Sequence, residues 1–126
     1  MSHSNDTATG QVRLAVVMDV LSVAVFVIIG RLSHHETLTP GGLLRTIVPF
    51  FVGLVVGWTA VVVLRMSAAR WRGGVVVWAA TLVVGMVIRH FTHQGVAVSF
   101  VIVAAIFLAL FLIGWRLVAK LVRRHS

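Results

Sequence analysis

Residues 95–118 read GVAVSFVIVAAIFLALFLIGWRLV, and Arg116 is the only charged residue among them. At about 1.5 Å per residue, a helix over this stretch is about 36 Å long, which exceeds the roughly 30 Å hydrocarbon core of a bilayer. The stretch therefore predicts a transmembrane helix.

Three earlier stretches have the same character and predict three more spans. They cover about residues 14–30, 43–64 and 73–88. The third is the shortest, and Arg72 and Arg89 at its ends can extend their side chains to the headgroups. The prediction is an all-α integral membrane protein in which residues 13–118 form a four-helix domain. This domain lies between a polar tail, residues 1–12, and a basic tail, residues 119–126.

The composition excludes an ordinary soluble domain. The chain has 126 residues, of which 60% are hydrophobic and 11% charged, whereas soluble domains average about 45–50% and about 25%. The absence of cysteine excludes disulfide and thiol chemistry. The net charge of +8 does not indicate a nucleic-acid partner, because the basic residues lie mostly between the apolar stretches. No basic stretch is interleaved with aromatic residues, as in a binding platform. The expected partner is the lipid bilayer.

Four spans place both termini and the second loop on one side of the membrane. Eight basic residues are expected there and three on the other side: Arg13, Arg65, Arg70, Arg72, Arg116, Lys120, Arg123 and Arg124, against Arg31, Arg45 and Arg89. Lys and Arg are enriched in cytoplasmic loops. The split therefore predicts a multi-pass protein of the cell membrane with both termini in the cytoplasm.

The two halves of the chain share short elements at similar spacing. The Gly-Trp pair at residues 57–58 recurs at 114–115, and an arginine followed by Ser/Thr-His occurs from Arg31 and again from Arg89. A constant offset favours a duplicated helical hairpin. Because each copy contains two spans, the copies would be related by a parallel pseudo-two-fold axis along the membrane normal.

Asp19 is the only acidic residue within a predicted span. Ala15 and Ser22 share its helical face, which is therefore expected to point into the bundle. An ionised carboxylate at this depth is costly unless it is paired or hydrated. We consider two interpretations, a proton or ion site and a structural ion pair with Arg116 of the fourth span.

A second group of polar residues lies in or beside the two external loops. Its members are Arg31, His34, His35, Glu36, Arg45, Arg89, His90, His93 and Gln94. Because a guanidinium suits carboxylate and phosphate groups, the three arginines predict an anion site, with His34 and Gln94 beside them. Protonation of His34 would strengthen anion binding at about pH 6–7.

Two other interpretations of this group remain open. His90 and His93 are one helical turn apart and His34 could approach them, which is a weak indication of a metal site. The residues could also serve only as helix caps and headgroup contacts. We expect no cofactor.

The second span contains two features that concern helix packing. Thr39 and Pro40 are typical of a helix start, with Thr39 as the cap. Pro49 predicts a bend, since it removes the hydrogen bond to the carbonyl of Arg45. Gly53 and Gly57 allow close approach of another helix, first of all one from the same chain.

Several motifs together resemble one family. These are GRLSH at 30–34, LRT at 44–46, PF at 49–50, Gly53-x-x-x-Gly57-Trp58, GVVVW at 74–78, Gly85-Met86-x-x-Arg89, QG at 94–95 and SFV at 99–101. They resemble the uncharacterised small membrane proteins labelled domain of unknown function 3054, over residues 12–118. The resemblance implies a four-helix membrane domain without an assigned reaction. It includes Asp19, Arg31, His34, Arg45, Arg89 and Gln94, but not His35, His90 or His93.

Two functional hypotheses follow. The first is a transporter or permease-like protein whose polar site combines Asp19 with the external arginine and histidine residues. The alternative is a structural or accessory subunit that binds a membrane-protein partner, or a second copy of itself, through Gly53 and Gly57 or the fourth span. We do not expect an enzyme, because no nucleophile with an adjacent base is apparent.

Overall fold

The structure, a computed structural model, describes residues 2–33 and 39–124. The described residues form helices and connecting turns without a strand, which confirms the all-α prediction. The elements are α1 (Ser2–Ser33), α2 (Pro40–Val63), α3 (Trp71–Phe91), α4 (Val98–Leu112) and α5 (Gly114–Arg124). Four stretches are long and apolar enough to cross a membrane: Gly10–Leu32, Pro40–Val63, Trp71–Phe91 and Val98–Arg124.

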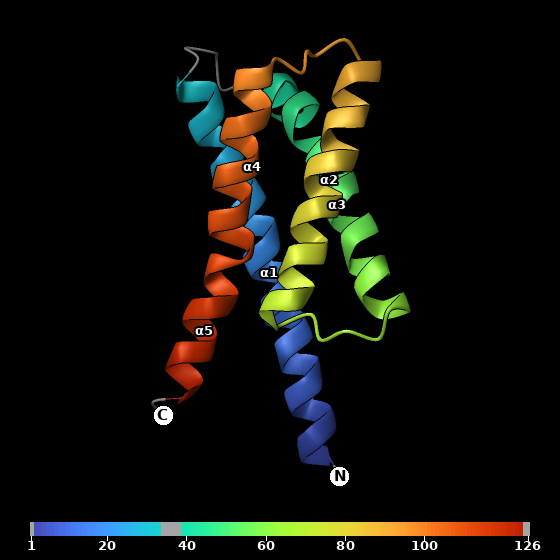
Figure 1. The fold of residues 1–126 in the computed structure, drawn as a ribbon, viewed down its shortest axis with the longest axis vertical. Helices are drawn as coiled ribbons and strands as arrows, with labels where there is room; N and C mark the ends of the chain where they lie inside the picture. Colours follow the sequence, from blue (N-terminus) through green and yellow to red (C-terminus); the bar gives the residue numbers. More distant parts are fainter. Residues whose placement is uncertain (1, 34–38, 125–126) are drawn as a thin grey trace.

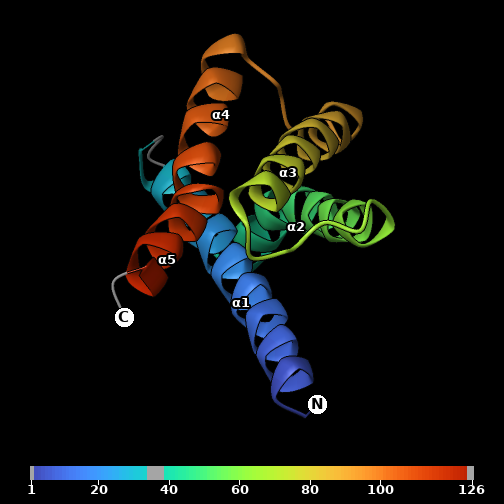
Figure 2. The same cartoon turned by 60° about the horizontal axis from the view of Figure 1, so that its bottom comes forward.

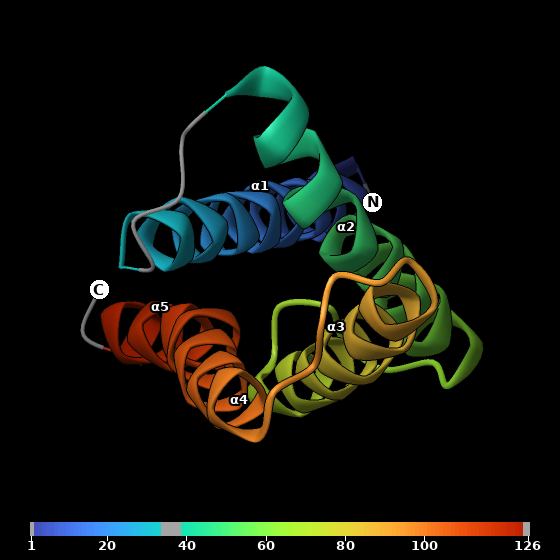
Figure 3. The same ribbon diagram turned by 90° about the horizontal axis from the view of Figure 1, so that it is seen from above.

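The helices run alternately up and down (Figure 1). The start of α1, the end of α5 and the connection between α2 and α3 lie at one end, which we call the terminal end. The connection between α3 and α4 lies at the opposite end. Seen from above, the four spans surround a common interior, with α5 continuing the path of α4 (Figure 3). The side of the membrane that the terminal end faces stays a prediction.

The helices extend further than the predicted spans. α1 begins at Ser2, so that residues 2–12 of the predicted polar tail are helical, and its first turns project beyond the bundle (Figure 2). This segment contains no proline, and a single glycine lowers helix stability by only about 1 kcal/mol. At the other terminus, α5 carries the fourth span through to Arg124, and most of the predicted basic tail is therefore helical too.

The start of α2 agrees with the sequence pattern. Thr39 is the N-cap, its hydroxyl accepts a hydrogen bond from the backbone N–H of Gly42 at 3.1 Å, and Pro40 occupies the first turn. Pro40 needs no hydrogen-bond donor there, because the first N–H groups of a helix have no partner within it. α2 continues through the buried Pro49 to Val63.

The closest helix packing in the bundle is between α2 and α3. A Cβ atom on Gly53 would lie 2.6 Å from the Cα of Thr81, and one on Gly57 would lie 2.9 Å from the Cα of Val77. The two glycines therefore let the backbones touch, which confirms the expected packing within the chain. This face of α2 is consequently occupied by α3 and is not available to a partner protein.

The middle of the bundle is apolar. Phe50 is fully buried, its ring meets that of Phe26 edge-on at 5.4 Å, and a Cβ on Gly85 would collide with it at 2.6 Å. The buried residues that complete this layer are Val23, Val27, Leu54, Val61, Val77, Ala104, Leu108 and Leu112. The layer separates the polar residues at the two ends.

Candidate functional site

Three arginines meet around one cavity of about 470 Å³ at the end opposite the termini. Arg31 comes from the end of α1, Arg45 from the start of α2 and Arg89 from the end of α3. The three arginines that the sequence analysis assigns to one site thus line the same cavity. Other polar groups that line the cavity belong to Thr46, His93 and Gln94, and apolar ones to Phe26, Val27, Ala97 and Phe100.

Arg31 is positioned against the first turns of α2. Its Nη1 donates to Oγ1 of Thr46 at 2.9 Å, and that hydroxyl donates in turn to the carbonyl of Gly42 at 3.0 Å. A Cβ on Gly42 would lie 2.5 Å from Nη2 of Arg31. The absence of a side chain at Gly42 thus provides the space that the guanidinium occupies.

Arg89 is held by the loop that follows its own helix. Its Nε donates to the carbonyl of Gly95 at 3.2 Å, and Nη2 donates to the carbonyl of Gln94 at 3.1 Å. The guanidinium carbon lies 4.3 Å from the ring centre of Phe100, within the range of a cation–π contact. His93 and Gly95 have positive φ angles of 59° and 89°, which turn the loop back toward the arginine.

Arg45 makes a longer contact at the rim, where Nη2 donates to the carbonyl of Thr92 at 3.2 Å. The hydrogen bonds given above join these arginines to neutral oxygen atoms of the protein. None of the described residues that line the cavity is acidic. The arrangement therefore places three cationic groups around one space, which suits anion binding.

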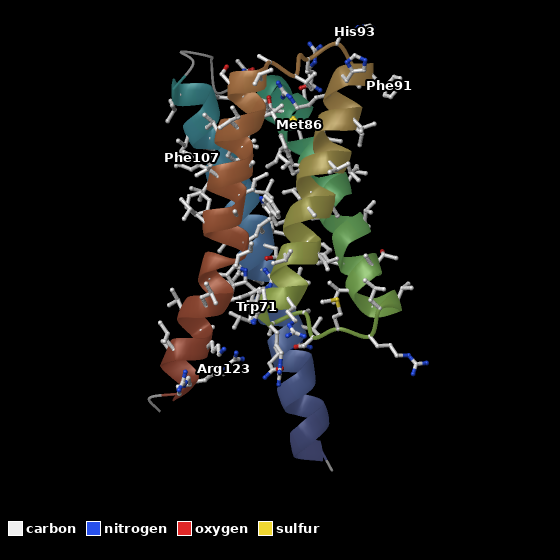
Figure 4. All side chains as sticks on the ribbon, in the orientation of Figure 1. Trp71, Met86, Phe91, His93, Phe107 and Arg123 are labelled. Carbon is white, nitrogen blue, oxygen red and sulfur yellow. The ribbon has the colours of Figure 1, made fainter. Side chains whose placement is uncertain are left out.

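The histidines singled out from the sequence differ in where they lie. His93 lines the cavity, and Figure 4 shows it at the end opposite the termini. His90 is exposed, and its ring meets that of Phe91 at 5.5 Å. His34, with His35 and Glu36, lies outside the described residues. Within the described part of the chain, no three His, Asp or Glu side chains are close enough to share a metal ion.

Asp19 lies elsewhere, fully buried at the other side of the apolar layer. Its Oδ1 and Oδ2 accept from Nη1 and Nη2 of Arg116 at 2.8 and 2.9 Å. The structural interpretation, an ion pair between these two residues, is confirmed. Ala15 and Ser22 are buried on the same face of α1, as expected. Asp19 does not line the arginine cavity, so the combined site proposed from the sequence divides into two.

The sequence pattern did not identify the other ligands of this carboxylate. The indole N–H groups of Trp58 and Trp115 donate to Oδ2 and Oδ1, both at 2.9 Å. Arg116 also donates to the carbonyls of Ala68 and Leu112 at 2.8 and 2.7 Å. The repeated Gly-Trp pair was the available signal, because each copy contributes one donor to Asp19.

The room for Arg116 comes from Gly74 of α3. A Cβ at Gly74 would lie 2.6 Å from the Cδ of this arginine. Corresponding residues of the two repeated elements thus lie together. Trp58 and Trp115 meet at Asp19, and Arg31 and Arg89 meet at the arginine cavity. A two-fold relation between the two hairpins stays a prediction.

Comparison with known proteins places these features in one family. Neither the curated proteins nor the solved structures gave a match. Residues 16–119, which include Asp19, the three cavity arginines and Arg116, match the family described as Protein of unknown function (DUF3054). This range covers most of the chain and agrees with the resemblance seen in the sequence. The chain is therefore a member of the DUF3054 family.

Proposed function

We propose that this multi-pass membrane protein binds a small anion in the arginine cavity and transports it across the cell membrane. Both termini lie in the cytoplasm in this proposal, and the arginine cavity opens to the external side. The observation that carries the proposal is the convergence of Arg31, Arg45 and Arg89, from three helices, on one cavity of about 470 Å³. We propose transport without catalysis.

The charge arrangement favours an anion as the ligand. Two unit charges of the same sign repel by about 4 kcal/mol at 4 Å when the effective dielectric constant is about 20. An anion among the guanidiniums replaces this repulsion by attraction. Carboxylate and phosphate also match the parallel N–H groups of an arginine. In this proposal His34 stands beside the cavity, as expected from the sequence, and its protonation raises the affinity further.

The helix packing supports movement of the anion beyond the cavity. The inner end of the cavity is apolar, formed in part by Phe26 and Phe100, whose ring centres are 6.3 Å apart. α2 and α3 form one closely packed unit, and their contacts with α1 and α4 are less extensive. Movement of this unit relative to α1 and α4 would separate Phe50 of α2 from Phe26 of α1, whose ring centres are 5.4 Å apart, and open a path inward.

Proteoliposome flux measurements test the proposal. Purified protein is reconstituted, and uptake of chloride, phosphate and small carboxylates is compared with empty vesicles at pH 5–8. We expect uptake of at least one of these anions, its loss in Arg89→Gln, and no change in Arg13→Gln. Arg13 is a suitable control because it is exposed and lines none of the described cavities. Its substitution removes one positive charge, as Arg89→Gln does.

Binding is measured separately by thermal unfolding in detergent. We expect these anions to raise the melting temperature of the parent protein and of Arg13→Gln, more at pH 6 than at pH 8. They should leave Arg89→Gln unaffected. Equal responses of the three proteins would contradict an anion site at the arginines. Binding without uptake would contradict transport and retain the site.

A further inference from the structure

A second basic cavity, of about 760 Å³, lies at the terminal end. It is bounded by α1, the connection between α2 and α3, the start of α3, and α5. Its charged lining residues are Arg70, Arg72, Arg116, Lys120 and Arg123. Figure 4 shows Trp71 and Arg123 at this end, far from His93. It is therefore separate from the arginine cavity.

The surplus of positive charge in this basic cavity comes from its rim. Arg116 is already neutralised by Asp19 at 2.8 Å. The side chains of Arg72 and Lys120 are exposed, one at the start of α3 and the other on α5. No acidic residue is among the described residues that line the cavity. A ligand that enters here meets cations from two different helices.

An apolar groove of about 300 Å³ adjoins the basic cavity. Gln11 and Ser67 line both spaces, so that they form the boundary between them. The groove runs between α1 and α2, and its apolar lining includes Val12, Val16, Trp58, Val61 and Val62. Most of its lining residues belong to two of the apolar spans, which acyl chains surround in a bilayer.

We propose that the basic cavity and the apolar groove together bind one anionic phospholipid. The phosphate headgroup lies between Arg72 and Lys120, and an acyl chain passes Gln11 and Ser67 into the groove. Basic pockets between transmembrane helices are a known mode of headgroup recognition. The pairing of a cationic cavity with an apolar groove favours a lipid over a free anion, because an inorganic anion uses only the cavity.

The position of the site along the spans agrees with the depth of a lipid headgroup. The cavity lies where α3 begins, at Trp71, and where α5 turns from apolar residues to the basic sequence of its last turns. Tryptophan and the ends of apolar helices occupy the interface of a bilayer. The headgroups of surrounding lipids are therefore at the height of Arg72 and Lys120.

The first experiment measures lipid binding by the purified full-length protein in detergent at 0.15 M salt. Native mass spectrometry and melting temperature are followed as phosphatidylglycerol or phosphatidylcholine is added. We expect one phosphatidylglycerol to be retained and to raise the melting temperature, and phosphatidylcholine to do neither. Removing two charges with Arg72→Gln/Lys120→Gln should weaken phosphatidylglycerol binding roughly 30-fold, about fivefold for each charge.

The matched control removes two exposed arginines that do not line the cavity, in Arg13→Gln/Arg65→Gln. Neither side chain lines the basic cavity or the groove, and we expect less than a threefold change. Equal weakening by both double variants, or equal binding of the two lipids, would overturn the proposal in favour of general electrostatic attraction. Arg89→Gln should bind phosphatidylglycerol normally, which separates this site from the arginine cavity.

A second experiment tests the groove. Val62 and Val63 are neighbours on α2 and are 75% and 72% exposed, but only Val62 lines the groove. Val62→Trp should weaken phosphatidylglycerol binding at least tenfold, and Val63→Trp should not. The free-anion control uses Arg89→Gln, in which the arginine cavity no longer responds to anions. If inorganic phosphate or glycerol phosphate stabilises this variant as much as the lipid does, the ligand is a free anion and the lipid proposal is wrong.

Discussion

The buried ion pair between Asp19 and Arg116 gives the sharpest test of how the bundle is held together. Both side chains are completely buried. The two guanidinium nitrogens of Arg116 lie 2.8 and 2.9 Å from the two carboxylate oxygens of Asp19. Removing one partner leaves the other charge buried without compensation, which costs about 3–5 kcal/mol in proteins. Asp19→Asn and Arg116→Gln should each lower the free energy of unfolding by this amount.

The double variant distinguishes the pair from two independent contributions. In Asp19→Asn/Arg116→Gln no charge is left in the cluster, and the amide oxygen of Asn can still accept from one indole. We expect the double variant to lose about 3 kcal/mol less than the sum of the two single variants. Ser22→Ala is the control on α1, because its hydroxyl donates only to the carbonyl of Met18 in the same helix.

Unfolding by sodium dodecyl sulfate in mixed micelles measures these differences. Circular dichroism reports helix loss, and tryptophan fluorescence reports the cluster directly, since Trp58 and Trp115 both donate to Asp19. Ser22→Ala should cost less than about 1 kcal/mol. If the two single variants add within about 0.5 kcal/mol in the double variant, the residues are not coupled and the reasoning is refuted.

Three further predictions concern packing, the core and topology. Gly53→Ala should destabilise the bundle by about 1–3 kcal/mol in the same unfolding assay, because its Cβ would lie 2.6 Å from the Thr81 backbone; Gly41→Ala, with nothing within 4 Å, should be nearly neutral. Thr81→Val should stabilise by about 1 kcal/mol or more, since Oγ1 of Thr81 is buried without a hydrogen-bond partner; a loss of stability would mean that the hydroxyl is satisfied. In this cysteine-free chain, Ser67→Cys should react with an impermeant thiol reagent only from the cytoplasm and Thr92→Cys only from outside, and the reverse pattern would contradict the predicted orientation.

Much of the fold follows from the sequence because the bilayer allows few solutions. An apolar stretch of about 20 residues forms a helix in lipid, because only in a helix are all the backbone hydrogen bonds of a single segment made within that segment. The helix ends were less predictable. Residues 2–12 are polar and carry no apolar pattern, yet α1 extends through them. Hydropathy measures insertion into lipid, and it does not report whether a polar segment continues a helix.

The candidate site was predictable in part for a related reason. Asp19 and Arg116 are the only charged residues inside their predicted spans, and burial in lipid drives opposite charges together. Their neutral ligands could not be foreseen in the same way. Trp58 and Trp115 lie toward one end of their predicted spans, where indoles commonly occupy the membrane interface. Their N–H groups instead satisfy Asp19, and that depends on how the helices are rotated, which a single sequence does not specify.

The small number of acidic residues explains why Arg116 forms an ion pair within the chain and most other arginines do not. The chain has 11 Lys and Arg against 3 Asp and Glu, so that most of its cations have no acidic side chain with which to pair one to one. Arg116 pairs with Asp19, the one acidic residue within a predicted span. The surplus charges must therefore meet neutral oxygens, headgroups or anions from outside the chain. Folding gathers part of this surplus around two cavities, one at each end, instead of spreading it over the surface. The proposed anion site at Arg89 and the proposed lipid site at Arg72 and Lys120 can consequently fail independently, because the apolar layer of Phe50 and Leu108 lies between them.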